Sequence, residues 1–258
     1  MQTPCLPIPR LLEGRLALVT GAGRGNGRAI ALGLARAGAR VVVTDLDATG
    51  ARATAEQIRT DAGQAWPHAL DVTDPHQCQA LARQVRSEAG RVDLLVNNAG
   101  IIIREGTDTH RAPENWRRTI DVNLHGTFNV TYAWLPDLKA THGTIVNIAS
   151  IAAYAGQGGS LGYSPSKGAI KMFTQSLAAE LAVHGVRVNA LAPGVIETPM
   201  TAPTRQDPQR LERFMSRIPM GRLGQPEELV GPVVFLSSGL ASYVTGVTLP
   251  VDGGFLAV

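Results

Sequence analysis

The chain has 258 residues, a formal net charge of +3 and 44% hydrophobic residues, so it can bury a sizeable core. It contains no apolar run of about 18 residues, which argues against a membrane span, and its basic residues are scattered, which argues against a nucleic-acid partner. With only Cys5 and Cys78, the chain favours a reducing cytoplasm over a disulfide-built fold. Residues 1–12 are proline-rich and lack the basic start and apolar centre of a signal peptide, so we expect a flexible arm.

A glycine-rich turn follows the first predicted strand, Leu16–Val19, and opens a predicted helix. Strand, glycine turn and helix in this order are typical of dinucleotide sites, because glycine lets the backbone approach a pyrophosphate at the positive end of a helix. The glycines that fit this role are Gly21, Gly25 and Gly27. The common fingerprint has a glycine where this chain has Asn26. By itself, such a turn is equally consistent with a purely structural role.

Asp45 ends the second predicted strand, Arg40–Thr44, and lies 18 residues after the last glycine of the turn. A carboxylate at this position of a βαβ unit accepts hydrogen bonds from the adenosine ribose and repels a 2′-phosphate. We therefore predict NAD as the cofactor rather than NADP. Asp47 is a nearby alternative for this role, and Arg24 and Arg40 could tolerate a phosphate.

A predicted helix over residues 48–62 and a weak predicted strand through His68–Leu70 come next. Asp71 follows this strand directly. It either meets the adenine edge of the cofactor or serves as a capping or turn residue ahead of a helix that starts near Asp74. The residues leave both roles open.

The fourth predicted strand, Val92–Val96, runs into Asn97-Asn98-Ala99-Gly100. We expect this turn to brace the sheet and line the cofactor cleft. A long helix around residues 116–132 then contains Asn123. Because asparagine is unfavourable inside a helix, Asn123 implies either a kink that frees a carbonyl or a packed hydrogen bond.

Ser150, Tyr163 and Lys167 form the candidate catalytic group. Ser150 closes the predicted strand 143–149, and functional residues gather at the carboxyl ends of such strands. Tyr163 and Lys167 begin a predicted helix that runs to Gly185, and their spacing places both side chains on one face. A free phenol has a pKa near 10, and an ammonium about 4 Å away, at an effective dielectric constant of about 20, supplies the roughly 4 kcal/mol that brings this pKa near neutrality. Tyr163 would then act as a general acid and base, whereas a solvated helix face is the alternative.

The remaining elements continue the same alternation, with strands at Val186–Leu191 and Val247–Pro250 and a helix at Pro226–Ser237. No linker or repeat divides the chain. The pattern predicts an α/β fold: a single doubly wound, Rossmann-type domain, residues 13–258, with a parallel sheet of about seven strands flanked by helices on both faces. Within this domain, the proline-punctuated residues 195–215 are predicted to cover the substrate.

In these motifs the chain resembles the short-chain dehydrogenase/reductase family over nearly all of its length after residue 12. The glycine turn after Thr20 resembles the family's cofactor turn, Asn97–Gly100 its sheet-bracing motif, and Pro193-Gly194 its late turn. The family's catalytic tetrad is matched in type, order and spacing by Asn123, Ser150, Tyr163 and Lys167.

The resemblance implies an oxidoreductase in which Tyr163 is the acid and base, Ser150 binds the substrate oxygen, and Lys167 lowers the pKa of Tyr163 and binds the nicotinamide ribose. Asn123 would free a helix carbonyl that holds a water in a proton relay to Lys167. Asp71 and Val72 would meet the adenine, and Thr198 the nicotinamide carboxamide. The full set of expected cofactor-binding residues is Gly21, Arg24, Gly25, Asn26, Gly27, Asp45, Asp71, Val72, Asn98, Ala99, Gly100, Tyr163, Lys167, Pro193, Gly194, Val195, Ile196 and Thr198.

We expect the enzyme to interconvert a secondary alcohol and a ketone, with a polar hydroxy compound such as a polyol or sugar acid as substrate and no metal. The expected pocket side chains are Arg104, Tyr154, Gln157, Glu197 and Met200. The carboxy-terminal half is similar to sugar-acid and polyol dehydrogenases of the family. It is also similar to 3-oxoacyl carrier-protein reductases that use NAD(P)H, which is the alternative function, while a non-catalytic NAD-binding sensor or scaffold is the alternative of another class. The resemblance also implies a homotetramer that associates through the helices carrying Asn123 and residues 163–181.

Overall fold

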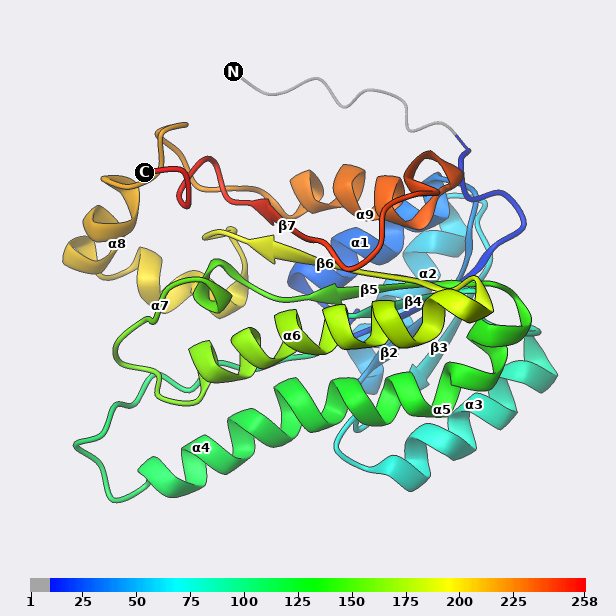
Figure 1. The fold of residues 1–258 in the computed structure, drawn as a ribbon, viewed down its shortest axis with the longest axis horizontal. Helices are drawn as coiled ribbons and strands as arrows, with labels where there is room; N and C mark the ends of the chain where they lie inside the picture. Colours follow the sequence, from blue (N-terminus) through cyan, green and yellow to red (C-terminus); the bar gives the residue numbers. More distant parts are fainter. Residues whose placement is uncertain (1–9) are drawn as a thin grey trace.

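The computed structural model describes residues 10–258, which alternate between strands and helices (Figure 1). The strands are β1 Leu16–Thr20, β2 Arg40–Asp45, β3 Ala65–Ala69, β4 Leu94–Asn97, β5 Thr144–Ile148, β6 Arg187–Pro193 and β7 Thr248–Val251. The α-helices are α1 Gly25–Arg36, α2 Ala48–Thr60, α3 Pro75–Glu88, α4 Ala112–Ile120, α5 Gly126–Ala140, α6 Tyr163–Leu181, α7 Ala202–Arg205, α8 Pro208–Met215 and α9 Val230–Ser237. A π-helical turn, Asp121–His125, joins α4 to α5, and short 3₁₀ turns span Ile151–Ala153, Ala182–His184, Pro199–Thr201, Pro226–Leu229 and Gly239–Ala241.

The strands form one parallel sheet in the order β3-β2-β1-β4-β5-β6-β7. Helices α1, α2 and α9 cover one face, and α3, α5 and α6 cover the other (Figure 1). The predicted doubly wound domain is therefore confirmed. The chain first builds outward from β1 to β3 and then returns to β4, so the carboxyl ends of β1 and β4 flank a crevice at the point where the direction reverses.

The residues of β1 show why the strands are continuous apolar runs in the sequence. Ala17 and Val19 pack into the core beneath α1 and α2, whereas Leu16 and Leu18 pack into the core beneath α3 and α5. All of them are fully buried, because neighbouring side chains of a strand point to opposite faces and helices cover both.

Among the predicted boundaries that differ from the structure, two have a specific physical reason. β3 starts at Ala65, before the predicted His68, and contains Pro67, which is tolerated because β3 is an edge strand that pairs only with β2. Leu12, assigned by the sequence to the arm, is 1% exposed, and its N–H donates to Ala37 O at 2.9 Å, so it belongs to the domain. Residues 1–9 of the predicted arm lie outside the described residues.

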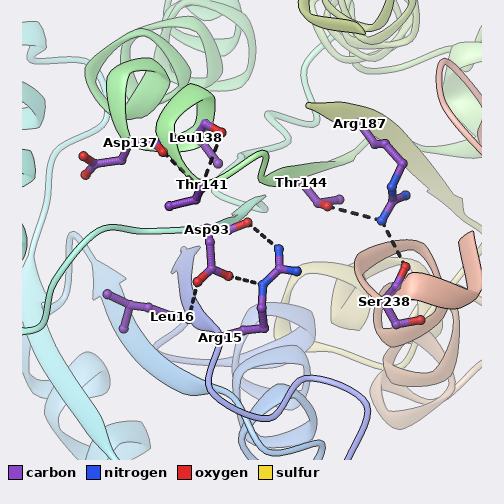
Figure 2. Close-up of polar contacts among 9 residues, drawn as sticks. All are labelled: Arg15, Leu16, Asp93, Asp137, Leu138, Thr141, Thr144, Arg187 and Ser238. Atoms are coloured by element: carbon purple, nitrogen blue, oxygen red, sulfur yellow. Dashed lines mark hydrogen bonds and ion pairs between the residues drawn. The ribbon is translucent and has the colours of Figure 1, made fainter. Parts of the chain in front are cut away.

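Charged side chains bind backbone groups at the amino-terminal ends of the strands, the ends opposite the crevice (Figure 2). Arg15 forms an ion pair with Asp93, whose carboxylate also accepts the N–H of Leu16 at 3.0 Å. Arg187 donates to Leu236 O at 2.8 Å and to Ser238 O at 3.0 Å, at the carboxyl end of α9. A cation at this end of a helix also compensates the helix dipole. Burial and the nearby Arg15 charge lower the pKa of Arg187.

We predict that Arg187→Met lowers the free energy of unfolding by about 1–3 kcal/mol, because the carbonyls at the end of α9 lose a charged donor. Urea unfolding of the wild type and the variant measures this difference. The control is Arg52→Met, which removes an exposed arginine of α2 and should change the value by no more than about 0.5 kcal/mol. Equal losses in both variants would contradict the role given to Arg187.

Candidate active site

A cavity of about 1400 Å³ opens at the carboxyl ends of the strands. This volume exceeds the roughly 300–1,000 Å³ typical of single small-molecule sites, so there is room for a dinucleotide and a second small molecule. Its walls come from the glycine turn, the ends of β2, β4 and β5, the start of α6, and the segment after β6. Of the sequence-predicted cofactor residues, the cavity is lined by Gly21, Arg24, Gly25, Asn26, Gly27, Asp45, Asp71, Val72, Asn98, Ala99, Gly100, Tyr163, Lys167, Pro193, Gly194, Ile196 and Thr198. Val195 is buried behind the wall.

Two positions of the glycine turn, Gly21 and Gly27, cannot take a larger residue, as expected where backbone approaches a dinucleotide. A Cβ on Gly27 would lie 2.1 Å from Gly21 O and 2.4 Å from Asn98 Nδ2. Gly21 has a φ of +61°, which favours glycine. Within residues 10–258 no side chain caps the amino end of α1, so its backbone N–H groups can receive a phosphate.

The bracing turn after β4 holds this glycine turn in place. The Asn98 side chain donates to Thr20 O at 2.9 Å and to Gly21 O at 3.0 Å. The backbone N–H groups of Asn98 and Ala99 both donate to Thr20 Oγ1 at 3.0 Å. Asn97 is buried and donates to Thr131 Oγ1 and Asn147 Oδ1, both at 2.9 Å. These contacts show the bracing that the sequence predicted.

The acidic residues that the sequence assigned to the adenosine end differ in their contacts. Asp45 accepts the N–H of Gly23 at 2.8 Å and that of Asp47 at 2.9 Å, and it lines the cavity. Asp47, the alternative, instead caps α2 through the N–H of Thr49. Asp71 also lines the cavity, but its Oδ1 accepts from the N–H and hydroxyl of Thr73, which makes it a turn-forming residue.

The predicted tetrad is brought together around one wall of the cavity. Ser150 lies two residues after the end of β5, and Tyr163 begins α6. Lys167 lies one turn further on, with Nζ 5.9 Å from the centre of the Tyr163 ring. Lys167 Nζ donates to Ile148 O at 2.7 Å. All three catalytic candidates of this wall line the cavity, whereas Asn123 lies behind it.

Asn123 sits in the π-helical turn and makes the packed hydrogen bonds that were one of its two predicted roles. Its amide accepts from Ile101 N at 2.8 Å and donates to Ile101 O and Ser166 Oγ, both at 3.0 Å. Its backbone carbonyl accepts the Thr127 hydroxyl at 2.9 Å. The wide turn thus supports both the loop after β4 and the start of α6.

The predicted electrostatic effect of Lys167 on Tyr163 is wrong for the chain alone. Burial raises the pKa of Tyr163, and the hydrogen bond with Ser150 and the charge of Arg104 only partly oppose this. Burial also lowers the pKa of Lys167 to about 8. The ammonium therefore faces its own desolvation cost, and its hydrogen bond goes to a carbonyl rather than to the phenol.

Of the predicted substrate residues, only Arg104 and Met200 line the cavity. Arg104 Nη2 donates to Met200 O and Thr204 Oγ1, both at 3.1 Å. Tyr154 is turned away, because its hydroxyl donates to Thr248 O and Lys171 lies over its ring. These contacts correct the prediction for Tyr154.

Glu197 and Gln157 also lie outside the cavity wall. The backbone around Glu197 pairs with Gly224, so Ile196 faces the cavity and Glu197 points to solvent. The N–H of Gln157 donates to Ser164 Oγ in the loop before α6. The sequence missed a further group on α4 and the π-helical turn, because exposed charged residues there look like any solvated helix face; the group comprises Glu114, Arg117, Arg118, Asp121 and His125.

Within the described residues, no group of three or more His, Cys, Asp or Glu side chains could bind a metal ion. None of the helices in residues 10–258 combines the length and apolar character that a bilayer crossing requires.

Fold and site together define a Rossmann-type, dinucleotide-binding oxidoreductase. A family model described as Enoyl-(Acyl carrier protein) reductase matches residues 21–256. The 3-oxoacyl-(acyl-carrier-protein) reductase FabG of Thermotoga maritima is 40% identical over 246 residues, which cover 95% of this chain and 99% of that protein. The chain therefore belongs to the short-chain dehydrogenase/reductase family and is an oxidoreductase of the CH–OH and keto class.

Solved structures agree with this assignment. A gluconate 5-dehydrogenase from Burkholderia cenocepacia J2315, in complex with NADP and tartrate, has a TM-score of 0.93 at 36% identity and covers 97% of this chain and 98% of that chain. A short-chain type dehydrogenase/reductase from Mycobacterium marinum has a TM-score of 0.90 at 34% identity, covering 96% of this chain and 98% of that chain.

We predict that the ligand-free protein gains stability between pH 7 and pH 10 through Lys167. Its pKa rises from about 8 in the folded chain to 10.5 on unfolding, so the unfolded state binds more protons in this window and stability increases with pH. Relative to Lys167→Met, the wild type should gain about 2–3 kcal/mol in urea unfolding between these two pH values. If the difference in unfolding free energy between the wild type and Lys167→Met stays constant with pH, the lowered pKa of Lys167 is contradicted.

Proposed function

We propose that the chain interconverts a secondary alcohol and a ketone with a nicotinamide dinucleotide, and that Tyr163 transfers the hydroxyl proton. The observation that supports this most directly is that Ser150, Tyr163 and Lys167 share a cavity with the glycine turn. The bound nicotinamide supplies or accepts the hydride. The glycine turn would bind the pyrophosphate, and the segment from Pro193 to Thr198 would hold the nicotinamide end.

Each member of the catalytic group has a separate task in this proposal. Tyr163 is protonated in the chain alone, so it is ready to give a proton to a ketone oxygen. Ser150 hydrogen-bonds the same oxygen, and Lys167 stabilises the phenolate that forms on Tyr163. Asn123 positions the others through its contacts with Ile101 and Ser166.

We propose NAD as the preferred cofactor. Asp45 lines the cavity at the end of β2, and each of its carboxylate oxygens keeps a lone pair beyond the N–H bond it already accepts. These lone pairs suit ribose hydroxyls, and the charge opposes a 2′-phosphate. The relative from Burkholderia binds NADP, so the comparison favours the other cofactor and the assay below includes both.

The substrate we propose is a hydroxy acid of the sugar-acid kind. Arg104 lines the cavity, and its charge is close enough to act on the pKa of Tyr163. Burial and the neighbouring Arg210 lower the pKa of Arg104, and within residues 10–258 Arg104 has no carboxylate partner. A substrate carboxylate would therefore be paired beside the reacting carbon. The tartrate in the Burkholderia relative is a hydroxy acid and supports this choice.

The alternative is reduction of a 3-oxoacyl thioester with NAD(P)H. It is supported by the 40% identity to the Thermotoga reductase and by the apolar side chains of Ile101, Ile102 and Met200 in the cavity wall.

We also propose self-association as a tetramer in the cytoplasm. Its support is the exposed aromatic surface on α5 and α6, where Phe128 stacks on Tyr132 with ring centres 5.8 Å apart.

Turnover with a substrate panel tests the function. We expect NAD with a sugar acid to give the highest kcat/KM among polyols, sugar acids, simple secondary alcohols and a 3-oxoacyl thioester, each assayed with NAD(H) and NADP(H). Tyr163→Phe should lower kcat about 10²- to 10⁴-fold because the acid and base is gone. Its dinucleotide Kd should stay within about twofold, because the lost hydroxyl is assigned to the substrate.

Tyr243→Phe is the control, since this tyrosine is fully exposed and should leave turnover unchanged. Wild-type turnover in Tyr163→Phe would remove the mechanism. Faster turnover of the thioester with NADPH would establish the alternative function. Dinucleotide binding without turnover of any compound would indicate a sensor or scaffold.

We predict that Arg104→Met raises KM for a sugar acid about 10- to 100-fold, the loss expected for a charge-assisted hydrogen bond. KM for the matching neutral polyol should change little. Steady-state kinetics with this substrate pair measure the effect. Arg111→Met is the control, because Arg111 lies on the same segment, pairs with Glu105 and does not line the cavity. An equal rise for acid and polyol would mean that Arg104 supports the loop rather than the carboxylate.

A further inference from the structure

Arg104 lies in the cavity wall with part of its guanidinium unused. Its Nη2 donates to Met200 O and Thr204 Oγ1, both at 3.1 Å, and a guanidinium has five N–H donors in all. The neighbouring acid, Glu105, does not neutralise this charge, because its carboxylate pairs with Arg111 at 3.6 Å instead. In the proposed function Arg104 receives the substrate carboxylate.

Arg210 reaches from α8 to the loop that leads into the catalytic helix. Its Nη2 lies 3.9 Å from the position that a Cβ on Gly159 would take. One residue further on, the carbonyl of Ser160 accepts the N–H of Tyr163 at 3.2 Å. Arg210 is half-buried and lies outside the cavity wall. It therefore lies beside the cavity, between α8 and the start of α6.

The charge of Arg210 is poorly neutralised. Within residues 10–258 the carboxylate that pairs with it belongs to Asp207, at 3.8 Å from Nε, which is too long for a hydrogen bond. The other oxygen of Asp207 accepts the backbone N–H of Arg210 at 3.0 Å and caps α8. An ion pair of this kind near solvent contributes little to stability. The Arg210 guanidinium therefore keeps its capacity to bind a further anion.

The two arginines act on each other and on the catalytic tyrosine. Burial and then the charge of Arg210 lower the pKa of Arg104. The charge of Arg104 in turn opposes the effect of burial on the pKa of Tyr163. Two positive charges at short range repel each other, and more strongly where solvent is excluded. A substrate carboxylate at Arg104 relieves only part of this repulsion, because it leaves Arg210 without an anion of its own.

We propose that Arg210 is a specificity-determining residue that pairs with a second anionic group of the substrate. The substrate is then a sugar acid with two negative groups: a carboxylate at Arg104 and a further carboxylate or a phosphate at Arg210. Both kinds of group match the planar fork of a guanidinium. The inference rests on the proposed function and narrows its substrate class. Arg210 lies outside the wall, as expected for a residue that meets the far end of an extended substrate.

Steady-state kinetics with three sugar acids test this inference: D-gluconate, D-glucarate and 6-phospho-D-gluconate. The first has one negative group, the second has two carboxylates, and the third has a carboxylate and a phosphate. With NAD, we expect the wild type to show a kcat/KM for one of the two doubly charged acids about 5- to 30-fold above that for D-gluconate. This range is that of a charge-assisted hydrogen bond, reduced because the Arg210 side chain is 40% exposed. Whichever acid is preferred identifies the second group as a carboxylate or a phosphate.

Three variants separate a role in specificity from a structural one. Arg210→Met should raise KM for the preferred acid about 5- to 30-fold and leave KM for D-gluconate within about twofold. Arg210→Lys should restore part of the preference, because it returns the charge without the fork. The control is Arg213→Met, which removes an exposed arginine of the same helix and should change KM for none of the acids. An unchanged Kd for NAD⁺ in each variant shows that the dinucleotide site is intact.

The outcomes distinguish this inference from the proposed function. If the wild type turns over D-gluconate as efficiently as both doubly charged acids, the role given to Arg210 is wrong and the proposed function stands. The same conclusion follows if Arg210→Met affects all three acids equally, because Arg210 would then support α8 and not a second charge. Turnover of none of the three acids would overturn the proposed substrate class, and the role of Arg210 with it.

Discussion

The whole site depends on the point between β1 and β4 at which the strand order reverses direction. These neighbouring strands lead into opposite halves of the sheet, so no crossover connection covers their carboxyl ends. The hydrogen bonds between Thr20 and Asn98 tie the two strand ends together across this gap. Because Asn98 also holds Gly21 O, the glycine turn and the wall after β4 form one rigid unit. The sheet itself therefore holds the part of the cavity that the glycine turn lines.

The catalytic group contains a buried cation that has no carboxylate partner within residues 10–258. Lys167 is 5% exposed, and its hydrogen bond goes to a backbone carbonyl. Its charge is therefore costly in the chain alone, which explains why its pKa falls to about 8. Such a site favours any negative charge that enters it. A phenolate on Tyr163 has that property, so the cost of the Lys167 charge in the chain alone becomes stabilisation when the phenolate forms.

The sequence predicted the order of the elements, the sheet and the convergence of Ser150, Tyr163 and Lys167, because these follow from local patterns. Alternating apolar runs and glycine turns define the strands, and the Tyr163-to-Lys167 spacing follows from one helical turn. It did not predict the pKa of Tyr163, which depends on how deeply the phenol is buried and on where the Lys167 ammonium donates. It also misplaced Tyr154 and Glu197, because a loop side chain is directed by tertiary partners such as Thr248 and Gly224 that no local pattern reveals.

The segment after β6 explains why substrate identity is the least predictable property of this site. Thr198 abuts the glycine turn, and the carbonyl of Met200 holds Arg104, so one stretch of chain contacts both the cofactor side and the substrate side. Its contact with Arg104 uses a backbone oxygen, which every residue type supplies. Side chains in this segment can therefore change without releasing the arginine, and the pocket can be reshaped while the hydride-transfer geometry stays fixed. Relatives with the same sheet and tetrad but different substrates are the expected consequence.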